Sequence, residues 1–316
     1  MNRREFLIGT VAATAVLRTG RGRLRAQTPD RAKLDRVAIM TYSFDRIVRV
    51  AGRPDDPART LDFFDIPEMF ADKYQVHNVE VQHNHFGSTE ASFFKEFRAR
   101  LAKTKSRVTN INLEFGNMSI TASDPVIRAQ AIDLTKQWID HAIELGSPRV
   151  MVNQGTPTPE NRQVAIEALT IMGDYGKAKK IMVSMEPRGG GGGGRNAAAP
   201  AAGGQATPPP VPPAGPPPPP AYLLLTEIIK GSGTYANVDI GNFGEQETQH
   251  AGMRAMFPYT VGNTHIKMNP ARYDLPAALA LMRELRYTGL YSIEAGGQGD
   301  PYENVQRIYE ALLQNM

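Results

Sequence analysis

The chain has 316 residues, a formal net charge of +4 and no cysteine. Residues 1–26 hold six arginines and one glutamate, so the remaining 290 residues carry 30 basic and 31 acidic side chains. Because this body is nearly neutral, it lacks the basic surface that duplex DNA binding requires, and we expect no nucleic-acid partner. Without cysteine the chain has no disulfide, thiolate nucleophile or thiolate metal ligand, which leaves carboxylates and imidazoles for metal chemistry.

The N-terminal segment, residues 1–26, is predicted to be an export signal. Arg3 and Arg4 precede an apolar run over residues 7–17, which is too short to span a bilayer as a helix of about 20 residues. The Arg-Arg-x-Phe-Leu string resembles a twin-arginine signal, which implies that residues 1–26 direct a folded protein to the periplasm or beyond. A basic amphipathic start to a cytoplasmic protein and a retained membrane tether are the alternatives. Beyond this signal we expect no membrane contact.

Eight short apolar runs rich in β-branched residues follow, and we predict each as a strand: 37–42, 78–82, 108–113, 149–153, 181–185, 236–239, 261–266 and 290–293. Segments with helical periodicity lie between them, most clearly 92–103 and 125–145. This alternation is typical of an α/β protein with a parallel sheet, and eight repeats favour a closed (β/α)8 TIM barrel over an open sheet. No G-x-G-x-x-G follows the first strand and no G-x-x-x-x-G-K occurs, so dinucleotide-binding and P-loop folds lose their main support.

Residues 188–221 differ in composition from the rest of the chain. They hold 11 of the 24 prolines and 9 of the 29 glycines, and they offer almost no apolar surface to offset the entropy of ordering. We interpret them as a disordered insertion, with a linker between two domains as the alternative. Five predicted strands precede the segment and three follow it, which favours one barrel over 36–316 with an insertion after the fifth strand.

Polar side chains stand at the ends of the last four predicted strands. These are Glu186, Asp239, His265 and Glu294. The carboxyl ends of barrel strands form the active face, and neighbouring strands lie about 4.8 Å apart, so the four side chains can converge. Three carboxylates and one imidazole suit a divalent cation, with Mn²⁺ first and Mg²⁺, Co²⁺ or Zn²⁺ as competitors. A single carboxylate at the end of a strand is more often a helix cap than a metal ligand. Four polar side chains at the ends of four successive strands are less easily explained as separate caps.

The same strand ends resemble those of a known family. Glu186-Pro187, Asp239-x-Gly241-Asn242, His265-x-Lys267 and Ser292-Ile293-Glu294 resemble the metal-binding motifs of the xylose isomerase-like TIM barrels, the sugar phosphate isomerase/epimerase superfamily. The resemblance covers 36–316, broken by the insertion. It implies that Glu186, Asp239, His265 and Glu294 bind the metal and that the two glutamates are the catalytic acid/base pair.

Two departures weaken an assignment to the ketose 3-epimerases of this family. Asn242 stands where those enzymes have a histidine, and Met268 stands where many members have an aspartate. The endonuclease branch requires a trinuclear zinc centre with several more histidines, whereas this chain has six in total.

Further polar residues are expected on the same face. His83, Asn153, Asn242 and Lys267 are predicted to bind substrate, and Tyr42, His85, Glu114 and Gln154 are weaker candidates. Glu80, inside the second strand, is interpreted as either a site residue or a structural carboxylate. Arg188 could reach an anion, whereas Trp138 and His141 lie on a helical stripe typical of a core.

These residues favour a metal-dependent sugar isomerase or epimerase. It would act on a small carbohydrate or keto-sugar through an enediolate that the cation stabilises. A lyase or dehydratase with the same metal site and a non-catalytic carbohydrate-binding barrel are the alternatives. The sequence leaves open whether the protein forms a homo-oligomer.

Overall fold

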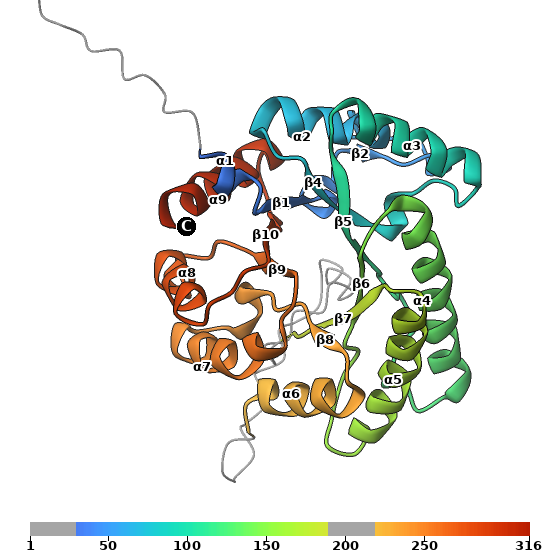
Figure 1. Ribbon diagram of the computed structural model, residues 1–316, viewed down its shortest axis with the longest axis vertical. Coiled ribbons are helices and arrows are strands. Elements are labelled where there is room, and N and C mark those ends of the chain that lie inside the picture. Colours follow the sequence, from blue (N-terminus) through green and yellow to red (C-terminus); the bar gives the residue numbers. More distant parts are fainter. Residues whose placement is uncertain (1–29, 189–218) are drawn as a thin grey trace, which may run out of the picture.

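The computed structural model of the chain describes residues 30–188 and 219–316 (Figure 1). The predicted export signal over residues 1–26 and residues 189–218 of the predicted insertion over 188–221 lie outside the described residues. Within the described part, strands alternate with helices from one end to the other. No helix there combines the length and the apolar composition needed to cross a membrane.

All eight predicted strands are present and run parallel. They are β1 (Val37–Met40), β4 (Asn78–Gln82), β5 (Arg107–Asn112), β6 (Arg149–Asn153), β7 (Met182–Glu186), β8 (Tyr235–Ala236), β9 (Asn263–Ile266) and β10 (Leu290–Ile293). Their order in the sheet is β8-β7-β6-β5-β4-β1-β10-β9, with every pair parallel. Parallel bridges from Ala236 to Thr260 and from Asp239 to His265 join the two ends of this sheet, so the predicted TIM barrel is confirmed.

Helices form a ring outside the strands (Figure 1). They are α2 (Ile66–Tyr74), α3 (Ala91–Lys103), α4 (Pro125–Leu145), α5 (Arg162–Ala178), α6 (Ala221–Ser232), α7 (Gln246–Met256), α8 (Leu275–Glu284) and α9 (Pro301–Asn315), with a short α1 (Arg31–Leu34) before the first strand. The predicted helices over 92–103 and 125–145 correspond to α3 and α4.

Helix α4 shows how local sequence sets these boundaries. The Asp124 side chain accepts a hydrogen bond from the Val126 amide, and Pro125 stands in the first turn, where its missing N–H costs nothing. The helix stops at Gly146, which adopts φ 70°, a left-handed conformation that glycine reaches without steric cost.

Four details differ from the sequence prediction. The strand predicted over 236–239 is β8, which ends at Ala236, so Asp239 does not end the strand but caps the 3₁₀ helix that follows it. Helix α6 begins at Ala221, the last residue of the predicted insertion. Tyr42 does not extend β1; it lies in a 3₁₀ helix over Thr41–Phe44, which the Ser43 hydroxyl ties to β10 by donating to the Ile293 carbonyl and accepting from the Ala295 amide. Strands β2 (Val48–Arg49) and β3 (Leu61–Asp62) were not predicted, because two-residue runs carry no periodicity.

The core has an apolar layer between strands and helices and a polar interior. In the apolar layer, Phe97 stacks on Phe63 with ring centroids 4.7 Å apart, and Phe86 packs on Trp138 at 5.3 Å. The interior holds polar residues that bond across the barrel, as between Glu80 on β4 and Asn263 on β9, which are not neighbours in the sheet.

The aromatic layer should be a main source of stability. Phe97→Ala removes a fully buried ring, so we expect the free energy of unfolding to fall by about 3–5 kcal/mol in urea titrations. Lys95→Ala, an exposed change on the same helix, should stay within about 0.5 kcal/mol of the wild type. Equal losses in the two variants would contradict the packing described here.

Candidate functional site

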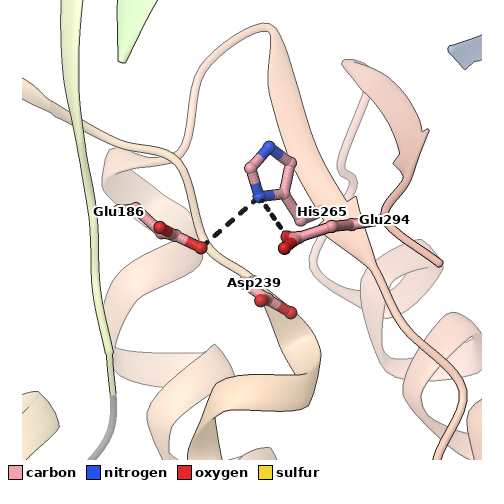
Figure 2. A group of neighbouring side chains, drawn as sticks. All are labelled: Glu186, Asp239, His265 and Glu294. Carbon is pink, nitrogen blue, oxygen red and sulfur yellow. Dashed lines mark ion pairs between the residues drawn. The ribbon is translucent and has the colours of Figure 1, made fainter. Parts of the chain in front are cut away.

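Four side chains that lie in the last four strands of the barrel or shortly after them meet at one point. Glu186, Asp239, His265 and Glu294 each offer one ligand atom, and these atoms all lie within 4.8 Å of one another. The four side chains are buried, with at most 1% of any residue exposed. Figure 2 shows the three carboxylates grouped on one side of the His265 ring. The predicted convergence is therefore present in the structure.

Local structure places each of the four residues. Glu186 is the last residue of β7, His265 lies in β9, and Glu294 directly follows β10. Asp239 precedes a 3₁₀ helix (Ile240–Phe243) and caps it by accepting a hydrogen bond from the Gly241 amide at 2.8 Å. A Cβ at Gly241 would lie 2.8 Å from Lys267 Cβ and 3.3 Å from Asp239 Oδ1, so a larger residue would displace this part of the site.

The His265 ring is oriented by contacts on both of its nitrogens. Nε2 lies 2.8 Å from Glu80 Oε1 on the interior side. Nδ1 lies 3.0 Å from Glu294 Oε2 and 3.6 Å from Glu186 Oε1, and among the described residues it has no hydrogen-bond partner. Nδ1 is therefore the nitrogen that the ring presents to the three carboxylates (Figure 2).

Positive charge lies within the cluster, at His265, and beside it, at Lys267 and Arg188. Burial lowers the pKa of His265, but the carboxylates of Glu80 and Glu186 outweigh burial and raise this pKa to about 10. The Lys267 ammonium pairs with Asp239 and lies 3.4 Å from Glu294 Oε1, and Arg188 Nη2 lies 2.9 Å from Glu186 Oε2. These cations reduce the repulsion that buried, like-charged carboxylates impose on each other.

The donor set fits a hard divalent cation. Two ligand atoms at about 2.1 Å from one ion lie at most about 4.2 Å apart, close to the spread observed here. Carboxylate oxygens and one imidazole nitrogen are ligands that Mn²⁺ accepts. The imidazole ligand atom would be His265 Nδ1, which is buried and directed into the cluster. Small side-chain adjustments would bring all four groups onto one ion.

The predicted substrate-binding residues lie at different distances from the cluster. Asn242 donates a hydrogen bond to Glu186 Oε1 at 3.3 Å and accepts one from Lys267 Nζ at 3.3 Å. Asn242 and Lys267 therefore both contact the cluster directly. Asn153 reaches it through Arg188, whose Nη2 donates to Asn153 Oδ1 at 2.8 Å.

His83 is linked to the cluster through Glu114 and Asn153. His83 Nδ1 accepts a hydrogen bond from the Glu114 amide at 3.0 Å, and the Glu114 carboxylate in turn accepts from Asn153 at 3.0 Å. His85 is fully buried and bonds Thr41 and Asp45 at 2.9 and 2.8 Å, which is a structural role.

Sequence reasoning gave too little weight to Glu80 and Arg188. Arg188 holds three site residues together, because its backbone also pairs with the Gln154 side chain in both directions, at 2.6 and 2.9 Å. Glu80 was detectable from pattern: Asn78, Glu80 and Gln82 alternate with valines along β4, and all are buried. Alternation of period two indicates that one face of the strand is lined with polar groups.

Two cavities open beside the cluster. One, of about 330 Å³, is lined by Glu294 and Lys267 together with Asn304 and Arg307 of α9. The other, of about 230 Å³, is lined by Glu114, Asn153, Gln154 and Arg188. A larger cavity, of about 800 Å³, is lined by Phe93 and by residues between 49 and 64, and none of the four cluster residues lines it, so size does not identify the site.

Comparisons with known proteins agree with this fold. The sequence model of the xylose isomerase-like TIM barrel family matches residues 60–198. No curated protein matches the chain in sequence.

Solved structures resemble most of the chain. A xylose isomerase domain protein from Planctomyces limnophilus is 15% identical, with a TM-score of 0.58 over 88% of this chain and 95% of that one. A D-allulose 3-epimerase from Methylomonas sp. is 13% identical, with a TM-score of 0.59 over 89% and 98%. A 3-keto-D-glucoside 4-epimerase from E. coli is 12% identical, with a TM-score of 0.57 over 85% and 99%. At these identities the similarity shows the fold.

The environment of His83 predicts how acid affects stability. Burial lowers its pKa to about 4, so between pH 6.5 and 4 the unfolded chain binds more protons at this residue than the folded chain does. The stability from the neutral ring is present above pH 6.5 and is lost as the pH falls through this window. When the pH is lowered from 7 to 4.5, the free energy of unfolding should fall by about 2 kcal/mol less in His83→Gln than in the wild type. An equal fall in the free energy of unfolding in both proteins would contradict the lowered pKa of His83.

Proposed function

We propose that this chain is a divalent-metal-dependent sugar isomerase or epimerase-like enzyme that acts on a small carbohydrate or keto-sugar through an enediolate. One observation carries the proposal: Glu186 and Glu294 come from different strands and both approach Nδ1 of His265, at 3.6 and 3.0 Å, within a buried cluster suited to a hard cation. A non-catalytic carbohydrate-binding barrel would not require two buried carboxylates in this arrangement.

The comparisons support the same conclusion. We infer that the chain is a member of the xylose isomerase-like group, because the family match over residues 60–198 and the four strand-end motifs belong to one continuous barrel. Two of the similar structures are sugar epimerases by name, one for D-allulose and one for a 3-keto-D-glucoside. They support a sugar substrate for this chain without specifying which sugar.

Glu186, Asp239, His265 and Glu294 would hold the metal, with Mn²⁺ first and Mg²⁺, Co²⁺ or Zn²⁺ as competitors. When bound, such a cation polarises the carbonyl and adjacent hydroxyl of the sugar and offsets the negative charge that develops on them. Burial of all four residues excludes water from this charge, which strengthens the interaction.

The two glutamates would move the proton. One carboxylate removes the proton from the carbon beside the carbonyl, and the other returns a proton to the opposite face, which inverts that carbon. Return of the proton to the neighbouring carbon gives isomerisation instead. Lys267, 3.4 Å from Glu294, supplies a positive charge beside the developing oxyanion, and Asn242, Asn153 and His83 supply hydrogen bonds to sugar hydroxyls.

A dehydratase is the second candidate, and Lys267 is the observation that favours it. Loss of a hydroxyl group from the enediolate requires a group that can donate a proton to it. The Lys267 ammonium lies on the wall of the 330 Å³ cavity beside Glu294, where it can reach a bound substrate. An unsaturated product would identify this reaction.

Hydrogen exchange tests the proposed chemistry. The metal-stripped protein is reconstituted with MnCl₂ and incubated in D₂O with D-fructose, D-allulose and a 3-keto-D-glucoside. The wild type should incorporate deuterium at the carbon beside the carbonyl of at least one sugar. Glu186→Gln and Glu294→Gln should each slow this incorporation by about 10²–10⁴-fold, because each loses a group that moves the proton.

Glu303→Gln, an exposed change on α9, is the matched control and should retain the wild-type rate. Wild-type rates in both Glu186→Gln and Glu294→Gln would remove these residues from the mechanism. Metal binding without exchange on any of the sugars would favour the carbohydrate-binding alternative.

A further inference from the structure

A fourth carboxylate, outside the cluster, is hydrogen-bonded to His265. Glu80 lies in the middle of β4 with none of its surface exposed, and its Oε1 is 2.8 Å from His265 Nε2. Oε1 also accepts from Asn110 Nδ2 at 2.9 Å, and Oε2 accepts from Asn263 Nδ2 at 2.9 Å. Donors from β5 and β9 therefore fix the Glu80 carboxylate in one orientation.

This arrangement needs an explanation, because a buried carboxylate is costly. Removing such a charge from water costs several kcal/mol even after the protein relaxes, unless hydrogen bonds satisfy it. The supporting network extends further, since Asn263 Nδ2 also donates to Asn237 Oδ1 at 3.0 Å. An apolar residue at position 80 would have filled the barrel without these requirements.

The geometry at His265 supplies the explanation. With Nε2 engaged by Glu80, the ring presents Nδ1 to Glu186 and Glu294. A ring turned the other way would break the bond to Glu80 and leave a buried carboxylate oxygen with one donor fewer. Metal-bound histidines in proteins commonly donate the other ring N–H to a carboxylate, which fixes the ring and makes it a better ligand.

We propose that Glu80 is a positioning residue: it holds His265 with Nδ1 directed at the ligand cluster and thereby sets the affinity of the site for its metal. The inference rests on the metal site proposed above. A purely structural Glu80 would stabilise the barrel interior without changing metal affinity.

Calorimetric titration of the metal-stripped protein with MnCl₂ separates the two roles. Glu80→Ala frees the His265 ring and should weaken Mn²⁺ binding by about 10–100-fold. Glu80→Gln keeps an oxygen that can accept from Nε2, so it should restore part of the affinity, and it is close enough in shape to fold if the alanine variant does not. Asn112→Leu is the control: it breaks a buried interior bond to Gln82 of 2.8 Å without touching Glu80 or His265.

Visible absorption of the Co²⁺-loaded protein provides a readout independent of turnover. The spectrum should shift in both Glu80 variants and stay unchanged in Asn112→Leu, although unfolding temperatures fall in all three. Wild-type affinity and spectrum in folded Glu80 variants would overturn the positioning role while leaving the proposed function intact. Equal losses of affinity in Asn112→Leu and Glu80→Gln would show a structural role only. A wild type that binds neither Mn²⁺ nor Co²⁺ would overturn the metal site itself.

Discussion

Repulsion among buried carboxylates is the constraint on which this structure depends. Two like charges about 4 Å apart repel by about 4 kcal/mol at the effective dielectric of a protein surface, and Glu186, Asp239 and Glu294 offer oxygens within 4.8 Å. Such a cluster persists only if positive charge enters it. His265 lies among the three, while Lys267 and Arg188 contact it from two sides. A divalent cation would supply the same compensation more completely, and it would also supply the Lewis acid that sugar chemistry requires.

The barrel meets this requirement through two levels of structure. At the carboxyl ends of the strands, β7, β9 and β10 and the segment after β8 deliver the four ligand atoms to one point. Below them, the interior is polar where a barrel built for stability would be apolar, and it includes the fully buried carboxylate of Glu80. The apolar layer outside the strands, including the stack of Phe63 on Phe97, stabilises the fold despite this polar interior. Stability and function are thus assigned to opposite faces of the same strands.

Much of the fold and the cluster could be predicted from sequence, because both depend on local pattern. Each strand is an apolar run, and each cluster residue follows from the rule that polar groups at the carboxyl ends of barrel strands share one face. The parts that were missed depend on contacts between distant segments. Glu80 and His265 are 185 positions apart, so nothing local shows that they bond. The same holds for Arg188, because its partner Asn153 lies 35 positions earlier in the chain. Composition alone assigns Arg188 to the insertion and gives no sign of this contact.

The proposed function requires one metal ion to bind between these four side chains. Crystals grown with MnCl₂ and measured at the manganese absorption edge test it directly. We expect one strong anomalous peak at the C-terminal end of the barrel, about 2.0–2.3 Å from one oxygen each of Glu186, Asp239 and Glu294 and from Nδ1 of His265. No peak at this position, or a peak bound by Nε2 of a turned His265 ring, would contradict it.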